Sequence, residues 1–329
     1  MTVTDEATFT AEVEKYRHEL RVHCYRMLGS YDDAEDLVQE TFLRAWRRRE
    51  DFEGRSSFRA WLYRIATNAC IDDVRRSQRV LPHQLEPASF PTEAIPARDD
   101  VPWLQPFPDV LLDRAEEPDA QVVRRETIEL AFLIAIQHLP ARQRAVLIFR
   151  DVLGWSAKET AAVMDLTVAS VNSALQRARP VLREHLPPRR TEWTPSGDPT
   201  AAEQELLAKY MEAFERADAA GLAALMHEDV RITMPPYPFW FSGRDAAEEI
   251  LGANLHPDGA AYRGEWQFLV AGVNRQPALA GYLRVPGDTI YRPFGFDVFR
   301  IEDGLVAEMV AFEITDFPLY GLPDHLASA

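Results

Sequence analysis

Cysteine, long apolar runs and any leader-like segment are scarce in this sequence of 329 residues. Only Cys24 and Cys70 occur, and neither has a metal-ligand spacing, so we expect reduced buried thiols rather than a disulfide or a zinc site. The central run from Leu130 to Ile136 is far shorter than the roughly 20 apolar residues that cross a bilayer. Residues 1–25 mix acids and bases and do not resemble a signal peptide. These absences predict a cytoplasmic protein with no membrane contact, no metal and no cofactor.

Charge is distributed unevenly along the chain. Apolar residues make up 47% and charged residues 27%, which excludes a disordered or collagen-like chain. The formal net charge of −16 divides into −1 for residues 1–80, −7 for 81–123, +5 for 124–190 and −13 for 191–329. The basic region is therefore the candidate for binding a polyanion.

Proline and a change of periodicity divide the chain into five parts. Residues 81–123 carry eight prolines and lack sustained periodicity, which is typical of a linker. A second break, PPRRTEWTPSGDP at 187–199, precedes a region of partly alternating pattern. We predict a helical domain (1–80), an acidic linker (81–123), a basic helical domain (124–190), a short linker (191–199) and an α+β domain (200–329).

Two amphipathic helices are predicted in the first domain. One follows Ser30, which has capping-box spacing with Asp33, and the other begins at Ser57. The outer face of the first helix offers a mixed polar and apolar strip: Asp36, Gln39, Glu40 and Leu43. The outer face of the second offers residue types that hold phosphates and stack on bases: Arg59, Tyr63, Arg64, Asn68, Arg75 and Arg76. The loop from Arg47 to Ser56 between them is long enough to form a pocket for an unstacked base, although a plain solvated loop is the alternative.

The basic domain has the layout of a helix-turn-helix. Ser156 and Glu159 have the spacing of a capping box, Asp165 stands at the turn where glycine is usual, and a longer helix begins at Val168. Asp tolerates the left-handed backbone of such a turn better than most residues. The second helix would present seven residues to DNA: Ala169, Ser170, Asn172, Ser173, Gln176, Arg177 and Arg179. The alternative is a packing unit whose arginines are merely solvated.

Three segments resemble the extracytoplasmic-function group of sigma factors in the sigma-70 family: DDAEDLVQETFLRAW (32–46), SFRAWLYRIATNACIDDVRR (57–76) and LPARQRAVLIFRDVLGWSAKETAAVMDLTVASVNSALQRAR (139–179). The resemblance implies two all-α domains, sigma region 2 and sigma region 4, in that order. It implies core RNA polymerase, through the clamp helices of its largest subunit and its flap, and promoter DNA as partners. In many relatives the recognition helix is similar to TVKSRL, whereas here SVNSAL (170–175) replaces two cations with Asn172 and Ala174.

Roles for the quoted residues follow from the same resemblance. Asp36, Gln39, Glu40 and Leu43 would bind the polymerase clamp helices. The loop 47–56 and the six residues of the second helix would melt and read the −10 element and trap a flipped base. The helix-turn-helix would bind the −35 element, and the acidic linker would thread the RNA path of the polymerase.

Alternating segments near 262–273, 278–285 and 290–313, the last broken by Asp303-Gly304, predict strands in the carboxy-terminal region. Together with MPPYPFWFSGRDA (234–246), they resemble a SnoaL-like cone, in which a curved sheet wraps helices around a cavity. Candidate cavity residues are Met234, Trp240, Trp266, Phe268, Tyr282, Phe296 and Phe299. A small-molecule ligand is one partner that such a cavity allows, and a simple aromatic core is the alternative.

No catalytic residue is predicted. His227, Glu228 and Asp229 lie at an expected helix-to-strand junction, where capping or solvation explains them better than acid-base chemistry. The predicted function is promoter-specific transcription initiation, modulated intramolecularly by the appended domain. The alternatives are a DNA-binding regulator, a SnoaL-type isomerase or cyclase with a DNA-binding leader, or a purely structural extension.

Overall fold

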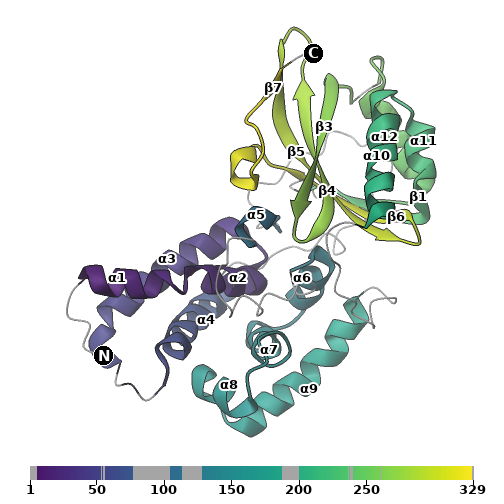
Figure 1. The fold of residues 1–329 in the computed structure, drawn as a ribbon. Coiled ribbons are helices and arrows are strands. Elements are labelled where there is room, and N and C mark those ends of the chain that lie inside the picture. The colour runs from purple at the N-terminus through teal and green to yellow at the C-terminus, as the bar shows by residue number, and fades with distance from the viewer. Residues whose placement is uncertain are drawn as a thin grey trace. The chain divides into compact units, whose positions relative to one another are not determined.

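The computed structural model describes residues 6–52, 54, 56–76, 104–112, 128–186, 200–235, 237, 240–259 and 261–327. These residues fall into two compact units (Figure 1). The first contains the described parts of 1–79, 104–107 and 113–195, and the second contains those of 80–103, 108–112 and 196–329. Most of the two predicted linkers, and positions 53 and 55 of the predicted 47–56 loop, lie outside the described residues.

The amino-terminal helices of the first unit form around buried residues at helical spacing. They are α1 (Glu6–Glu14), α2 (Arg17–Leu28), α3 (Tyr31–Arg47), a 3₁₀ turn η1 (Arg49–Asp51) and α4 (Phe58–Arg76). Ala34, Val38, Thr41 and Ala45 are the buried residues of α3, three or four positions apart. The Ser30 hydroxyl accepts a hydrogen bond from the Asp33 backbone N–H at 3.2 Å, which caps α3 where the sequence predicts.

The basic region supplies the other helices of this unit. They are α6 (Leu130–Gln137), α7 (Ala141–Leu147), a π-helical turn η5 (Ile148–Val152), α8 (Ala157–Met164) and α9 (Val168–His185). The predicted capping box is confirmed, since the side chains of Ser156 and Glu159 each accept from the other's backbone N–H. Asp165 has φ 55° and ψ 49°, so the left-handed turn that sequence analysis assigns to it is also confirmed.

An aromatic cluster joins α2 and α4 to the start of the helix-turn-helix inside the first unit. The Tyr63 ring lies 5.2 Å from that of Trp155, and the His23 ring lies 5.3 Å from that of Phe149. Arg144 of α7 is buried and donates hydrogen bonds to the Met27 carbonyl and, at 2.6 Å, to Gln137 Oε1. These contacts pack residues from the two predicted helical domains in one core.

His23 should make the stability of this core depend on pH. Burial lowers the pKa of His23 to about 3, whereas an unfolded histidine has a pKa near 6.5. Between those values the unfolded chain takes up a proton that the folded chain does not, so the free energy of unfolding falls as the pH falls below about 6.5. We expect about 2 kcal/mol of this loss between pH 7 and pH 5 to be absent in His23→Phe, measured by amide hydrogen exchange of α2 corrected for the intrinsic exchange rate at each pH. His256→Phe, at an exposed histidine, is the control and should keep the wild-type pH dependence.

Residues 104–112 are held along their whole length. The Gln105 backbone N–H donates to the Gly29 carbonyl at 2.9 Å, and Phe107, fully buried, packs against Tyr25 and Tyr31 in the first unit. From Pro108 onward the contacts belong to the second unit, where a short helix α5 (Asp109–Leu112) follows and Asp109 Oδ1 accepts from the Arg275 N–H at 2.8 Å. This part of the predicted linker is therefore ordered by contacts at both of its ends.

The second unit combines helices with one curved sheet. Its helices are α10 (Ala201–Glu215), α11 (Ala219–Ala224), α12 (Arg244–Leu255) and a 3₁₀ turn η7 (Phe317–Tyr320). Its strands are β1 (Met226–Thr233), β2 (Trp240–Ser242), β3 (Glu265–Val273), β4 (Gln276–Arg284), β5 (Ile290–Glu302), β6 (Leu305–Glu313) and β7 (Leu326–Ala327). The sheet order is β2-β1-β6-β5-β4-β3, with β7 paired to β5 and only the β1–β6 pair parallel among the described strands.

Strand register sorts the side chains of this sheet into two faces. Across β5 and β6, Phe299 pairs with Met309, Asp297 with Ala311 and Gly295 with Glu313, so these side-chain positions share one face. Helices α10 and α12 contribute to the same buried core as Phe299 and Met309. The predicted β5–β6 hairpin at Asp303-Gly304 is confirmed, with φ values of 51° and 78°.

Candidate nucleic-acid interface and ligand cavity

The outer face of α3 is exposed where sequence analysis predicts a docking strip. Asp36 and Gln39 are exposed, Glu40 is half-buried and accepts from Arg44 at 2.7 Å, and Leu43 is 52% exposed. A large aliphatic side chain that stays this exposed on an otherwise amphipathic helix is suited to burial against a partner. The four predicted residues therefore lie together on one surface.

A polar hollow of about 680 Å³ lies between the end of α3, the following turn and α4. Arginines and aromatic residues make up half of its lining, which consists of Glu40, Arg44, Arg47, Arg48, Asp51, Phe52, Gly54, Ser56, Trp61, Arg64, Ile65 and Asn68. Guanidinium groups pair with phosphates, and aromatic faces stack on bases. The predicted loop thus borders a hollow of the right chemistry for an unstacked nucleotide. Sequence analysis missed Arg44 and Trp61, whose helical spacing pointed only to ordinary surface and core positions.

Two of the six residues predicted to read DNA on α4 are engaged inside the protein. Tyr63 is only 1% exposed and donates a hydrogen bond to Glu19. Arg59 pairs with both oxygens of the same carboxylate, since its Nη2 donates to Oε2 at 2.6 Å and its Nε donates to Oε1 at 3.0 Å. Placing Tyr63 on the solvent face was wrong for this structure, because its ring fills the space beside Trp155. The other four, Arg64, Asn68, Arg75 and Arg76, are exposed.

All seven predicted DNA-facing residues of α9 are exposed. They alternate with Val171, Ala174, Leu175 and Ala178, which are buried against the rest of the first unit. Arg179 is bound to Asp151 by two hydrogen bonds of 2.8 and 3.0 Å, whereas Arg177 forms no ion pair with any residue that the structure describes. The helix therefore presents one continuous polar face, of which Arg177 is the more available cation.

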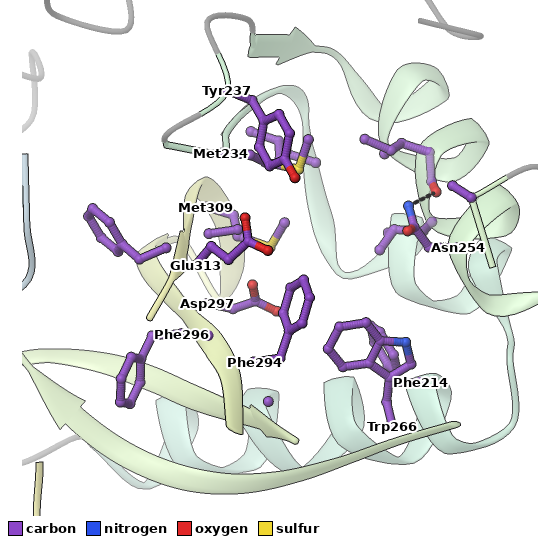
Figure 2. A pocket seen from close by; sticks show the side chains of 18 of the residues that line it. Phe214, Met234, Tyr237, Asn254, Trp266, Phe294, Phe296, Asp297, Met309 and Glu313 are labelled. Carbon is purple, nitrogen blue, oxygen red and sulfur yellow. Dashed lines mark hydrogen bonds between the residues drawn. The ribbon is translucent and has the colours of Figure 1, made fainter. Parts of the chain in front are cut away.

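A cavity of about 410 Å³ lies inside the second unit (Figure 2). Residues from α10, α12, the β1–β2 connection and strands β3 to β6 line it. Most of them are apolar or aromatic, including Phe214, Met234, Trp266, Phe268 and Phe294. Gly281 leaves space for the Phe268 ring, because a Cβ at position 281 would lie only 3.1 Å from that ring.

The predicted cavity residues divide between the two faces of the sheet. Met234, Trp266 and Phe268 line the cavity, whereas Trp240, Tyr282 and Phe299 do not. Tyr282 and Phe296 pack against Phe317 on the opposite face, and Figure 2 shows the Phe296 ring turned away although this residue is part of the lining. Phe299 fills the core beside Tyr210. The face of a curved sheet on which an aromatic side chain lies therefore cannot be predicted until the strand register is known.

Asp297 is the acidic group that sequence analysis missed in this cavity. Its carboxyl points into the cavity beside Phe294 (Figure 2), and burial raises its pKa to about 7. Its neighbours in the sequence, Phe296 and Val298, are buried on the other face. A lone acid at a core-facing position of the alternating strand 290–302 was the signal that could have revealed it.

Comparisons with known proteins match three parts of the chain to known families. The Sigma-70 region 2 family model matches residues 13–80, the Sigma-70 region 4 model matches 130–180, and the SnoaL-like domain model matches 207–309. The ECF RNA polymerase sigma factor SigG of Mycobacterium tuberculosis (strain ATCC 25618 / H37Rv) is 44% identical over 322 residues, which cover 97% of this chain and 85% of SigG. This chain belongs to the ECF RNA polymerase sigma factors.

Other members of the ECF sigma factors cover less of the chain or share only its fold. SigW of Bacillus subtilis (strain 168) is 30% identical over 184 residues, which cover 55% of this chain and 90% of SigW. The crystal structure of the ECF sigma factor SigJ of Mycobacterium tuberculosis matches with a TM-score of 0.56 at 22% identity, covering 95% of this chain and all of SigJ. The match to region 2 also separates this sigma factor from a simple DNA-binding regulator.

The described residues add two negative findings about this sigma factor. In that part of the chain, no helix combines the length and the apolar character that crossing a bilayer requires. Nor does the same part contain three or more His, Cys, Asp or Glu side chains grouped so that they could hold a metal ion.

Proposed function

We propose that this sigma factor binds the clamp helices of the largest RNA polymerase subunit through the outer face of α3. Asp36, Gln39, Glu40 and Leu43 would make the contact. The half-exposed Leu43 supports the proposal, since burying an aliphatic side chain inside a polar rim is a common source of affinity at protein interfaces.

The hollow between α3 and α4 is proposed as the site that holds a flipped base of the −10 element. Arg64 and Asn68 lie in its lining and are exposed, and Arg75 and Arg76 extend the cationic face along α4. Base flipping costs a few kcal/mol, and stacking on Phe52 or Trp61 together with phosphate contacts would offset that cost. Arg59 and Tyr63 are left out of this site because both are bound inside the protein.

Promoter melting tests this assignment. In a promoter carrying 2-aminopurine in the −10 element, Arg64→Ala with Asn68→Ala should lower the fluorescence gain on open-complex formation by about tenfold. Arg142→Ala, at an exposed arginine on α7 of the same unit, is the matched control and should melt the promoter normally. If the double variant melted the promoter normally, the hollow would not be the site of the flipped base.

Helix α9 is proposed to bind the −35 element in the major groove, with the same region meeting the polymerase flap. The observation that carries this proposal is the exposure of all seven residues of its predicted DNA face. The SVNSAL stretch provides Ser170, Asn172 and Ser173 for hydrogen bonds to base edges in place of cations, which favours specificity over phosphate attraction.

The two arginines of this face should differ in their effect. Arg177→Ala should weaken binding of −35 duplex DNA by about tenfold and lower the slope of log affinity against log salt by about one. Arg179→Ala should cost less, because Arg179 must leave its bidentate pair with Asp151 before it can meet a phosphate. Fluorescence anisotropy across a salt series checks both variants, and an equal loss for both would contradict this distinction.

The SnoaL-like domain is proposed to modulate the sigma activity of the same chain. It would do so as a binding domain rather than as an enzyme. We place the protein in the cytoplasm, where its polymerase partner works. The charge of −13 on residues 191–329, against the +5 of residues 124–190, supports an influence on promoter binding. The segment 104–112 also supports such an influence, because its consecutive residues Phe107 and Pro108 belong to different units. A small molecule in the 410 Å³ cavity is the proposed input.

Comparison of the full chain with residues 1–190 tests the modulation. Both proteins are mixed with core polymerase, and run-off transcription is measured on promoters selected by the full chain. A change of about fivefold or more in either direction supports modulation and gives its sign. Equal transcription at equal core occupancy would leave the domain without a regulatory role.

A further inference from the structure

The cavity of the SnoaL-like domain is rich in hydrogen-bond acceptors. Two carboxyl groups, those of Asp297 and Glu313, line the same apolar space (Figure 2). Glu313 lies 3.8 Å from the guanidinium of Arg263, which is half-exposed at the cavity lining. Asp297 has no cationic partner among the residues that the structure describes, and burial is the only cause of its raised pKa.

Two other polar groups of the cavity lining have hydrogen-bond partners other than Asp297. The Tyr210 hydroxyl, on α10, donates to the Met309 sulfur at 3.5 Å rather than to the carboxyl. The Asn254 amide, on α12, donates to the Ile250 carbonyl at 2.8 Å. Tyr237 completes the polar lining from the β1–β2 connection. A carboxyl surrounded in this way is costly to ionise unless a cation enters beside it.

The walls of the cavity also suit a cation with an apolar body. Phe214 and Phe268 meet edge to face at 4.6 Å, and Phe294 meets Trp266 edge to face at 4.9 Å, so aromatic rings surround one side of the space. Aromatic faces attract organic cations, most strongly where water is excluded. A volume of about 410 Å³ accepts a molecule of one to three rings.

We propose that this cavity binds a hydrophobic organic amine, whose protonated nitrogen pairs with Asp297 and whose apolar body lies against Phe214, Trp266 and Phe294. The proposal deepens the ligand-binding part of the proposed function by naming the chemical class of the ligand. Glu313 would accept a further hydrogen bond from the nitrogen, and Arg263 would keep the total charge of the occupied cavity near neutral.

The competing ligand class is a neutral carbonyl compound that accepts a hydrogen bond from protonated Asp297. One observation supports this carbonyl ligand: the Nε1–H of Trp266 is buried and has no acceptor among the described residues. The Asp297 carboxyl, which has no cationic partner among the described residues, favours the amine, and the two classes respond to pH in opposite directions.

The pH response follows from the proton on Asp297. The amine needs the ionised carboxylate, so its affinity should rise about tenfold between pH 6 and pH 8, since the pKa of Asp297 before binding is about 7. A carbonyl ligand needs the protonated acid, so its affinity should fall over the same interval. The same space is lined by four other titratable or charged residues: Tyr210, Tyr237, Glu313 and Arg263. The pH series is therefore repeated with Glu313→Gln, which removes the second carboxyl.

The test uses the full-length sigma factor and matched pairs of compounds that differ only at nitrogen or oxygen. One pair is 1-(2-naphthyl)ethylamine and 2-acetylnaphthalene, and one-ring and three-ring pairs bracket the cavity size. Calorimetry and ligand-observed NMR at pH 6, 7 and 8 give the affinities. Asp297→Asn keeps the size of the side chain, and Asp258→Asn, at a 95% exposed carboxylate of the same domain, is the matched control.

Tighter binding of an amine than of its ketone, a rise in affinity with pH, and a loss of about tenfold or more in Asp297→Asn but not in Asp258→Asn would support the proposal. Tighter binding of a ketone, with affinity falling as pH rises, would overturn the amine while keeping a ligand-binding cavity. Binding of neither class at about 1 mM would overturn both the amine and the ligand-binding part of the proposed function. The polymerase and DNA assignments are unaffected by any of these results.

Discussion

Leu43→Asp should lower the affinity of this sigma factor for core RNA polymerase by more than about tenfold and abolish run-off transcription at limiting concentration. Leu43 is 52% exposed in the free protein, so the substitution removes no packing from the core of the first unit. It places a charge on the surface that Leu43 shares with Asp36, Gln39 and Glu40, and a buried unpaired charge opposes association. Pull-down or anisotropy with labelled sigma factor and core enzyme measures the loss.

Val270→Asp is the matched control for this prediction. Val270 has the same exposure, 52%, but lies on β3 of the second unit. It should leave the affinity for core polymerase unchanged. If the two variants lost affinity equally, or if Leu43→Asp bound core polymerase normally, α3 would not be the docking helix.

Arg144→Met should destabilise the first unit by about 3 to 5 kcal/mol. Arg144 is 3% exposed and donates hydrogen bonds to the carbonyls of Met27, Gln137 and Leu139 and to the Gln137 side chain. Methionine fills similar space but donates nothing, so several buried acceptors would lose their donor at once. Because those acceptors lie on α2 and around α6, the loss should loosen the packing between the two helical regions.

Amide hydrogen exchange of α2 and α7 in the full-length protein measures this loss, since a two-unit chain does not unfold in one step. Arg142→Met is the matched control, because Arg142 is exposed on the same helix α7. It should leave exchange in α2 unchanged. Equal protection of α2 in wild type and Arg144→Met would show that the buried guanidinium does not hold the helices together.

Local signals predicted the elements of this fold well. Ser30, Ser156 and Asp165 act at short range, through caps and a left-handed turn, and the structure uses each of them as predicted. The strands and the Asp303-Gly304 hairpin also follow from alternation and turn chemistry within a few residues. Such features depend on neighbours in the sequence, which a single chain reveals.

Features that depend on contacts between distant residues were not predictable in the same way. Tyr63 has the spacing of a solvent-facing residue on α4, and its burial depends on Glu19 and Trp155, more than 40 positions away. The face of Phe296 and Asp297 depends on the register of β5 with β6, where a shift occurs between Arg300 and Ile301. The predicted faces of α3 and α9 remain exposed or half-buried in the structure, so helical spacing placed them correctly, whereas Glu19 and Trp155 cover part of the predicted face of α4.

Reconstituted transcription tests the central claim most directly. The full-length protein is mixed with core RNA polymerase that lacks any other sigma factor, and run-off transcripts are mapped on a genomic fragment library from the source bacterium. The account predicts discrete transcripts from promoters that share −35 and −10 elements, lost with Leu43→Asp and weakened about tenfold with Arg177→Ala. Stable binding to core polymerase without any promoter-directed transcript, or no binding at all, would contradict it.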